Sequence, residues 1–389
     1  VLSREQSPHR PGPFSCAWKP WGRAVHDAMH DNPSKRGVIS MKPAQMGFTR
    51  AMLNVLGCYA DTRPGPMLFL ISDAKQATHY AAEHWDPMVR GSPRLREIFR
   101  VSAGERREVM TEKPFKGGRI DFAGAGTVAS VTSRTYVIVA IDEYEVFMDN
   151  FPASAAGDGF TMAESRTQAV EHLAQVWVWS HPRRKGQGID DLYDRLSDRR
   201  AWVFDCPHCQ APIRPAWSMV HFGKTEDDGT IDPASAVFRC PHCGEVVTDQ
   251  QRARATWPPE LGGSGRFESD LDEAEAANRR YVGLAINRLA DPDVTVRSLA
   301  ERFVAAKDDR SRMAFFNTGL GEAFTSSTAV VTDELVESRV QRVETIAVPG
   351  GRFGCQYLTV GVDVQAPESN PTLYVRASAW GTNGVEYVV

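Results

Sequence analysis

Residues 137–143 read VIVAIDE, an apolar run that ends in two adjacent carboxylates, Asp142 and Glu143. Five consecutive apolar residues without polar alternation predict a central strand that is covered on both faces, as in a parallel sheet flanked by helices. Two acids at a strand end are often only solvated side chains. The pair therefore needs a partner motif before it indicates chemistry.

The first half of the chain alternates short apolar runs with helical patterns, which predicts a largely parallel α/β sheet. The expected strands are rich in Val, Ile, Phe or Trp and are bounded by Gly, Pro, Asp or Ser, and they cover residues 36–41, 67–72, 119–123, 136–142 and 175–181. Helices are expected between them at residues 49–59, 74–89 and 163–173. Further along, a helical pattern covers residues 296–316, and strand patterns cover residues 357–363, 373–379 and 385–389.

Residues 42–49 (KPAQMGFT) lie between the first expected strand and the first expected helix, where a phosphate-binding loop belongs. The usual pattern is GxxxxGK followed by Ser or Thr. Gly47 and Thr49 match it, whereas Phe48 occupies the usual lysine position and Lys42 the first glycine position. A lysine at the start of the loop can still reach a phosphate from the opposite lip, and Thr49 would supply a hydroxyl for Mg²⁺. Taken alone, the pattern also fits an ordinary strand–turn–helix.

The loop and the acidic pair together favour ATP hydrolysis. In P-loop ATPases the first carboxylate at such a strand end holds Mg²⁺ and the next one activates the attacking water. Asp142 would then bind the metal, and Glu143 would be the general base. The next strand ends at Ser180, followed by His181 and Pro182. Motor ATPases sense hydrolysis at such a strand end, although a lone histidine there is more often structural.

Two matching Cys-x-x-Cys pairs predict a structural zinc site. They read CPHC at residues 206–209 and 240–243, with 30 residues between them. Four thiolates in two such turns suit tetrahedral Zn²⁺ and leave no ligand position for water. His208 and His242 are alternative ligands that we expect to point outward. Outside the four predicted ligands Cys206, Cys209, Cys240 and Cys243, the remaining cysteines are expected to be small buried side chains: Cys16, Cys58 and Cys355.

Composition limits the class of protein. The 389 residues are 42% hydrophobic and 24% charged, as in ordinary globular proteins with two or three domains. No apolar run approaches the roughly 20 residues of a membrane span, and residues 1–13 carry no signal-peptide core. We therefore expect an intracellular protein without a membrane segment. The net charge of −4 gives no global case for nucleic acid, but basic patches at residues 90–119 and 183–185 are either phosphate contacts or solvated faces.

These motifs, in this order, resemble those of the large terminase subunits of tailed phages, of the lambda or GpA type. Residues 11–14 look like the opening segment of that family, and residues 42–50 look like its variant P-loop. Residues 315–324 (FFNTGLGEAF) resemble a family signature, and residues 358–365 (LTVGVDVQ) look like the first strand of the family's nuclease domain. Asp142 and Glu143 match its Walker B acids, and Ser180 begins its coupling motif.

The resemblance implies a P-loop NTPase (ASCE-type) parallel sheet flanked by helices, a zinc-ribbon-like insertion, and a truncated RNase H-like β segment at the C-terminus. We place these parts at residues 1–202, 203–257 and 351–389, with a linker and helical segment at 258–350. It implies ATP, Mg²⁺ and Zn²⁺ as cofactors, and double-stranded DNA, a small terminase subunit, the portal or prohead and further copies of the chain as partners, in the host cytoplasm. By the same resemblance the phosphate and Mg²⁺ site would comprise Lys42, Gln45, Gly47, Thr49, Arg50, Asp142 and Ser180.

The resemblance also implies a nuclease, for which Asp363 matches the first metal-binding aspartate. A two-metal nuclease needs several convergent carboxylates, and residues 364–389 offer none where a partner is expected. We therefore expect a chain that hydrolyses ATP but does not cut DNA. Two alternatives stay open: a helicase, which would carry a second motor domain, and a prophage remnant that binds DNA without hydrolysing ATP.

Overall fold

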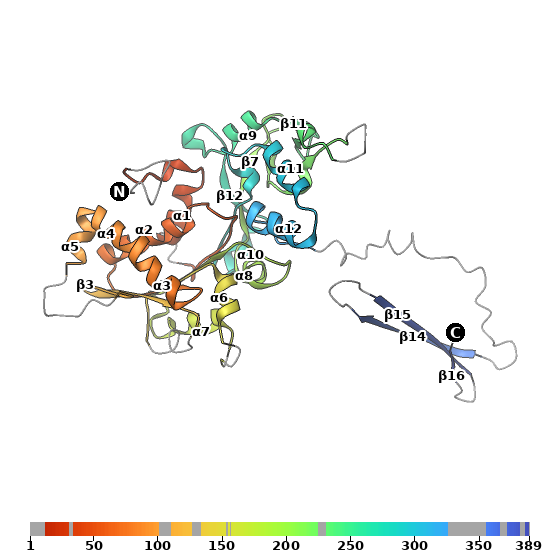
Figure 1. The fold of residues 1–389 in the computed structure, drawn as a ribbon, viewed down its shortest axis with the longest axis horizontal. Helices are drawn as coiled ribbons and strands as arrows, with labels where there is room; N and C mark the ends of the chain where they lie inside the picture. The colour runs from red at the N-terminus through yellow and green to blue at the C-terminus, as the bar shows by residue number, and fades with distance from the viewer. Residues whose placement is uncertain are drawn as a thin grey trace. The chain divides into compact units, whose positions relative to one another are not determined.

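The computed structural model describes residues 12–30, 34–100, 110–126, 134–152, 155, 157–224 and 231–325, and the backbone of three strands within residues 355–388. The chain divides into two compact units, Val1–Phe324 and Thr325–Val389 (Figure 1). Each unit is described by itself.

A ten-stranded sheet forms the centre of the first unit, in the order β12-β7-β13-β1-β6-β5-β2-β4-β3, with β8 paired to β7. Its inner strands, from β13 to β4, are parallel. The predicted largely parallel α/β sheet is thereby confirmed. The strands are β1 (Gly37–Met41), β2 (Pro66–Ile71), β3 (Glu112–Phe115), β4 (Gly118–Gly124), β5 (Ile138–Asp142), β6 (Gln175–Ser180), β7 (Arg200–Asp205), β8 (Pro212–Ile213), β12 (Arg266–Ser269) and β13 (Val282–Ala285).

Helices cover both faces of this sheet because alternate side chains of the apolar strands point to opposite sides. Val38, Phe69 and Trp177 belong to one apolar cluster, and their chain neighbours Ile39 and Leu70 belong to the other. The first cluster is covered by α1 (Gly22–His30), α2 (Phe48–Thr62), α3 (Ala74–Tyr80), α4 (Asp86–Gly91) and α5 (Pro93–Ile98), and the second by α6 (Tyr144–Asn150), α7 (Gly159–Ser165) and α8 (Gly188–Leu196) (Figure 1).

Two expected helices differ from the structure. The helix expected at residues 74–89 is interrupted by a π-helical turn, Ala81–Trp85, between α3 and α4. The helix expected at residues 163–173 begins earlier and ends at Ser165, followed by a short 3₁₀ turn, Gln168–Val170. Its start is fixed by Asp158, whose side chain accepts a hydrogen bond from the backbone of Thr161, the usual N-cap interaction.

The segment expected to be a linker with helices, residues 258–350, needs a correction. Its residues contribute β12 and β13 to the main sheet, and β13 lies directly beside β1. These strands have only four residues each and β13 contains Gly283, so the sequence pattern resembles a loop and the sheet decides the conformation. The helical pattern is confirmed in α11 (Val296–Ala305), α12 (Asp309–Ala314) and a π-helical turn, Phe315–Leu320.

A small sheet carries the cysteine pairs in the order β11-β10-β9, formed by β9 (Val220–His221), β10 (Val237–Arg239) and β11 (Val246–Val247). A third apolar cluster joins this module to α11 through Trp217, Phe238, Phe303 and Phe315. Because the cluster is continuous, the module and the helical segment share one core. The remaining elements are α9 (Asp249–Ala255), α10 (Glu273–Asn278) and the 3₁₀ turns Cys16–Trp18, Trp217–Met219, Pro233–Ser235, Pro259–Leu261 and Arg288–Ala290.

The second unit contains an antiparallel sheet, β14-β15-β16, formed by Cys355–Gln365, Thr372–Gly381 and Glu386–Val388. All three strands expected from the sequence are present. Asp363 lies on β14 opposite Tyr374, and its side chain lies outside the described part of the chain.

Across the described ranges, no helix combines the length and apolar character that crossing a membrane requires.

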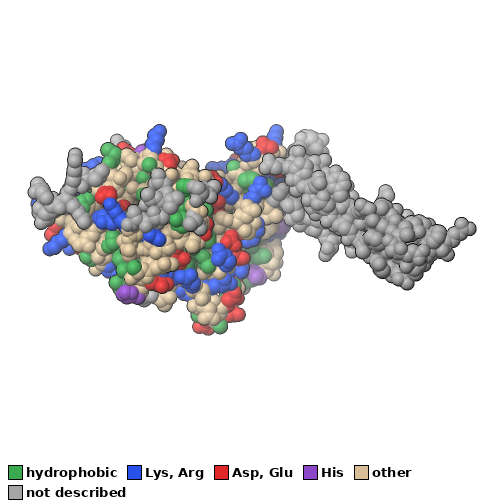
Figure 2. Space-filling view, turned by 90° about the horizontal axis from the view of Figure 1, so that it is seen from below, with side chains coloured by type: hydrophobic (Ala, Val, Ile, Leu, Met, Phe, Trp, Pro, Cys, Tyr) green, Lys and Arg blue, Asp and Glu red, His purple; other side chains and the backbone are tan. Residues whose placement is uncertain are grey.

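Basic and acidic side chains are interspersed on the surface that Figure 2 shows. Within the basic patches, Arg94 pairs with Asp61 at 2.6 Å, and Lys113 pairs with Asp86 at 2.9 Å. Arg183 likewise pairs with Asp149 at 2.5 Å. The pairs of Arg94 and Arg183 favour solvated, paired faces at those two positions, whereas Lys113 is buried and its pair with Asp86 is internal.

Candidate active site

The loop after β1 is anchored at both ends. Lys42 is buried, and its backbone N–H donates to the carbonyl of Ser180 at 3.1 Å, which joins the loop to the end of β6. Gly47 precedes α2 with φ 78° and Gln45 has φ 59°. Both lie in the left-handed region, where glycine carries no penalty. The loop therefore turns sharply into the N-terminus of α2, and Gln45 is exposed at its tip.

Asp142 ends β5 and is fully buried. Its Oδ2 accepts a hydrogen bond from the Thr49 hydroxyl at 2.7 Å, and its Oδ1 accepts from the Trp179 indole at 2.8 Å and from the Glu143 backbone at 3.0 Å. Burial, with the negative charge of Glu143, raises the pKa of Asp142 against the opposing effect of Lys42. Two predicted site residues from distant segments, Thr49 and Asp142, are thus in direct contact.

Glu143 is held at both carboxylate oxygens. Oε1 is 2.7 Å from the Lys42 ammonium, and Oε2 is 3.1 Å from Nδ1 of His181. Burial alone would raise the pKa of Glu143, but His181 and Lys42 outweigh it and lower the pKa. Glu143 has φ 51° at the start of α6, a left-handed backbone that costs energy for a residue other than glycine. Such strain is typical of functional sites.

Ser180 lies between the loop after β1, which carries Lys42, and the acids at the end of β5, because β6 lies between these strands. Its backbone is paired with Met41 of β1, and its buried hydroxyl accepts a hydrogen bond from the backbone of Glu145 at 3.2 Å. Glu145 in turn accepts from the backbone of Ile189 at 2.7 Å. Ser180 therefore connects the loop after β1 with the first turn of α6 and, through Glu145, with α8.

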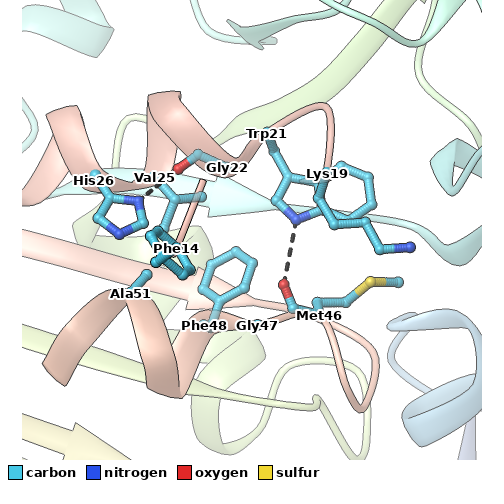
Figure 3. A pocket seen from close by; sticks show the side chains of 10 residues that line it. All are labelled: Phe14, Lys19, Trp21, Gly22, Val25, His26, Met46, Gly47, Phe48 and Ala51. Carbon is cyan, nitrogen blue, oxygen red and sulfur yellow. Dashed lines mark hydrogen bonds between the residues drawn. The ribbon is translucent and has the colours of Figure 1, made fainter. Parts of the chain in front are cut away.

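Phe48 does not face the polar cluster. It is buried, and its ring packs edge-on against Trp179 at a centroid distance of 5.6 Å. With Phe14, Trp21 and Val25 it lines a small cavity beside α1 (Figure 3), where the Trp21 indole donates to the carbonyl of Met46 at 3.4 Å. Position 48 therefore faces a mostly apolar cavity, and the lysine that contacts the acidic pair comes from position 42.

Arg50 follows Thr49 on α2 and is partly buried. Burial lowers the pKa of its guanidinium, and its Nη1 is buried without a hydrogen-bond partner in the described part of the chain. An unpaired buried donor is costly unless a further group binds it. The Arg50 guanidinium is therefore a candidate for binding an anion beside the loop.

The family-like segment at residues 315–324 packs on the same loop. The Ala44 backbone donates to the carbonyl of Thr318 at 3.0 Å, and the Arg288 guanidinium donates to the carbonyls of Ala44 at 2.5 Å and Gly319 at 3.1 Å. Gly321 has φ 82°, and a Cβ there would lie 2.6 Å from Pro43. The close approach of the two segments therefore requires glycine at position 321.

Glu322 ties this segment to two other elements. Its Oε1 accepts hydrogen bonds from the Trp217 backbone at 2.8 Å and from the Asn287 amide at 2.5 Å. Burial raises the pKa of Glu322. Phe324 donates its backbone N–H to the carbonyl of Arg183 at 2.7 Å. The segment therefore bridges the loop after β1, the cysteine module and the chain that follows β6.

The four predicted cysteine ligands converge, with all four sulfur atoms within 4.8 Å of one another. Sγ of Cys206 lies 3.9 Å from Sγ of Cys243, and Sγ of Cys209 lies 3.8 Å from Sγ of Cys240. Four sulfurs bound tetrahedrally at about 2.3 Å from Zn²⁺ would be about 3.8 Å apart. The donor set and its spacing are therefore compatible with zinc.

The two CPHC turns are built alike. Gln210 and Gly244, each four residues after the first cysteine of its pair, both have positive φ, 61° and 75°. His208 Nε2 lies 3.1 Å from the carbonyl of Val246, and His242 Nε2 lies 3.0 Å from that of Pro212. Each histidine thus bonds to the opposite half of the module rather than to the sulfur cluster, which favours the all-cysteine ligand set.

The expectation that the other cysteines are buried is wrong for two of them. Cys58 is exposed and Cys16 is only partly buried. Cys58 lies four residues after Asn54 and four before Thr62 on α2, on the solvent-facing stripe of that helix. The side chain of Cys355 lies outside the described residues.

Three polar partners in the site were missed by sequence reasoning. Trp179 carried only the signal of an apolar strand, and Tyr80, a half-buried residue near Thr49 and the two acids, carried none. His181 was noted only as the residue after a strand end. Each is brought to the acids by strand order, which a motif does not reveal.

Two family models match this chain, and the boundary between them lies before residue 281, whereas the two compact units meet at Phe324. The family model "Phage terminase large subunit gpA, ATPase domain" matches residues 8–259, and "Terminase large subunit gpA, endonuclease domain" matches residues 281–389. The large terminase subunit of Escherichia phage lambda is 22% identical over 393 aligned positions, covering 95% of this chain and 58% of that protein. The solved large terminase of a thermophilic bacteriophage matches at 16% identity with a TM-score of 0.31, covering 44% of this chain and 39% of that one. Because the ATPase-domain model alone matches more than half of its residues, this chain belongs to the gpA family of phage terminase large subunits.

Proposed function

We propose that this chain hydrolyses ATP to drive double-stranded DNA into a viral capsid, as the motor part of a large terminase subunit. The observation that carries the proposal is the contact of two distant motifs: Lys42 with Glu143, and Thr49 with Asp142, at 2.7 Å each. A cation, a hydroxyl and two carboxylates beside a helix N-terminus are the groups that phosphoanhydride hydrolysis requires.

Each residue of the proposed site has a different role in binding or hydrolysis. Lys42 and the turn formed by Gln45 and Gly47 would bind the phosphates of ATP, with Arg50 beside them. Thr49 and Asp142 offer the hard oxygen donors that Mg²⁺ takes in such sites, together with phosphate and water. Bound there, Mg²⁺ would neutralise charge on the phosphates. Glu143 would accept the proton of the attacking water. Its pKa is lowered by His181 and Lys42, so the carboxylate is ionised, and transfer of Lys42 to a phosphate would remove one of these two influences and strengthen Glu143 as a base.

Ser180 is proposed to link hydrolysis to movement. Its hydrogen bonds reach the loop after β1 on one side and the first turn of α6 on the other. A movement of the loop after β1 on phosphate release would therefore be transmitted through Ser180 to α6, and through Glu145 to α8.

The cysteine module is proposed to bind one Zn²⁺ through Cys206, Cys209, Cys240 and Cys243, in a structural role. The sulfur spacing and the engagement of both histidines elsewhere support this ligand set. We keep residues 1–202 as the proposed ATPase part and residues 203–257 as the proposed zinc-ribbon-like module.

The proposed partners and location of this chain come from its resemblance to the terminase family. This chain spans 58% of the length of the lambda relative, so a small terminase subunit, a portal or prohead, assembly with further copies and a place in the host cytoplasm are proposals. Endonuclease activity, with Asp363 as a metal-binding residue, is likewise proposed for the family. A helicase is less well supported, because two terminase large-subunit family models match this chain.

The test is ATP hydrolysis by the purified chain with and without double-stranded DNA. We expect Mg²⁺-dependent hydrolysis that DNA stimulates and that Lys42→Ala weakens at ATP concentrations below saturation. Hydrolysis that is insensitive to Lys42→Ala would contradict the proposed site, and unwinding of a duplex without packaging would favour the helicase.

A further inference from the structure

His181 is placed to control the proposed base. Its Nδ1 lies 3.1 Å from Oε2 of Glu143, on the side opposite Oε1, which lies 2.7 Å from Lys42. The three residues follow three neighbouring strands, because β6 lies between β1 and β5 in the sheet. Each oxygen of the Glu143 carboxylate therefore has a bonding partner from a neighbouring strand end.

The contact with Lys42 limits Glu143 as a base. Each oxygen of an ionised carboxylate has a second lone pair for water, but an ammonium ion 2.7 Å from Oε1 stabilises the charged form and so weakens its affinity for a proton. In the proposed function Lys42 turns to a phosphate of ATP, which frees Oε1. Oε2 would still be bound by His181, so that the carboxylate keeps its orientation while its other oxygen faces the water.

The backbone around His181 is held firmly enough for this task. Ser180 before it is fully buried and bonded through its carbonyl to Lys42 and through its hydroxyl to Glu145. Pro182 after it restricts the backbone of His181 to extended conformations. The ring is therefore positioned by its neighbours, and the side chain itself is 19% exposed.

We propose that His181 is a positioning residue that orients Glu143 for water activation once Lys42 has transferred to ATP. This inference rests on the proposed ATPase function and adds to it a residue that acts through the base. A structural histidine at the end of β6 would instead stabilise the strand and leave the turnover number unchanged.

Three variants distinguish the two roles. His181→Ala removes the donor. His181→Asn places an amide N–H where Nδ1 of the imidazole was, whereas His181→Gln extends the amide to the position of Nε2, away from Glu143. The Asn and Gln variants are matched in chemistry and differ in the position of the donor.

The experiment measures kcat and KM for ATP, nucleotide affinity and thermal unfolding in the full chain. We expect His181→Ala and His181→Gln to lower kcat by about 10- to 100-fold, as expected when a reacting group is misplaced by about an ångström. We expect His181→Asn to recover most of kcat, with ATP affinity and melting temperature unchanged in all three. If His181→Ala fails to fold, the comparison of Asn with Gln still decides.

Equal kcat values for the Asn and Gln variants, or a wild-type kcat in His181→Ala, would overturn the inference. Failure of the proposed function has a different signature: the wild-type chain would not hydrolyse ATP, or Glu143→Gln would hydrolyse it normally. If only the His181 variants behave differently from expectation, the proposed ATPase site is retained without a role for His181. If the wild-type chain does not hydrolyse ATP, or Glu143→Gln hydrolyses it normally, both proposals are wrong.

Discussion

The proposed ATPase site and the cysteine cluster each gather four side chains from distant segments, but they differ in charge balance. The first comprises Lys42, Thr49, Asp142 and Glu143, and the second comprises Cys206, Cys209, Cys240 and Cys243. In the first, a cation meets a carboxylate and a hydroxyl meets another, each at 2.7 Å. In the second, four like groups lie within 4.8 Å of one another and contain no opposite charge. The first cluster can therefore form without a ligand, whereas the second needs a cation once its thiols ionise. We expect substitutions in the first to alter chemistry and those in the second to alter folding.

The largest effect is expected at the cysteine cluster. Zinc sites of this type contribute on the order of 10–16 kcal/mol of apparent binding free energy, which is largely folding energy. Cys206→Ser should reduce bound zinc from one per chain to none and unfold the module, because Cys206 is buried in its core. Elemental analysis and thermal unfolding test this.

Cys58→Ser is the matched control, since Cys58 is an exposed cysteine on α2. It should keep both the zinc and the melting temperature of the wild-type chain. Freshly purified, reduced wild-type protein without zinc would refute the assignment.

Lys42→Ala should have the next largest effect, and on chemistry rather than folding. It removes a proposed phosphate partner and leaves Glu143 with His181 alone. We expect ATP affinity to fall by about 10- to 100-fold, since a hydrogen bond to a charged group contributes about 1.5–3 kcal/mol. Lys185→Ala, at an exposed lysine beyond the site, should leave affinity unchanged. Equilibrium nucleotide binding measures both variants. If Lys42→Ala binds ATP as tightly as the wild-type chain does, substitutions in the proposed ATPase site do not alter chemistry as we expect.

A smaller effect is expected at Glu322, where the two regions are joined. Glu322→Ala leaves the Trp217 N–H and the Asn287 amide without their acceptor, so stability should fall by about 1–3 kcal/mol. Glu322→Gln should cost less, because it keeps an acceptor and removes a charge that burial disfavours. Denaturant unfolding distinguishes the variants, with Glu260→Gln at an exposed glutamate as the control.

The same residue predicts a modest dependence of stability on pH. Burial raises the folded-state pKa of Glu322 above its unfolded value, so the folded chain holds the proton more tightly. At a pH above the folded-state pKa, ionised Glu322 lowers the free energy of unfolding. As the pH falls from the folded-state pKa to the unfolded-state pKa, Glu322 becomes protonated in the folded chain and the free energy of unfolding rises again. Glu322→Gln should lack this component. A wild-type and Glu322→Gln pair with parallel stability–pH curves would contradict the buried environment of Glu322.

Sequence reasoning succeeded where one short segment holds the information. The run 137–143 predicted β5 because a strand buried on both faces needs apolar residues at every position, and each CPHC turn carries two of its four predicted ligands itself. It failed for β13, where four residues including Gly283 become a strand only beside β1. It also missed the partners of Asp142 and Glu143. Trp179 and His181 reach these acids because β6 inserts between β1 and β5, and that order is set by packing across the whole sheet.

The most direct test of the account is ATP turnover and ATP binding in Glu143→Gln, measured side by side. Glutamine keeps the shape of the side chain but cannot accept the proton of the attacking water, while Asp142 and Thr49 are unchanged. We predict wild-type-like binding of Mg²⁺-ATP and a fall in turnover of about 10²- to 10⁴-fold, the usual contribution of a general base. Turnover at the wild-type rate in this variant would contradict the account, because the acid at the end of β5 would then not be the base.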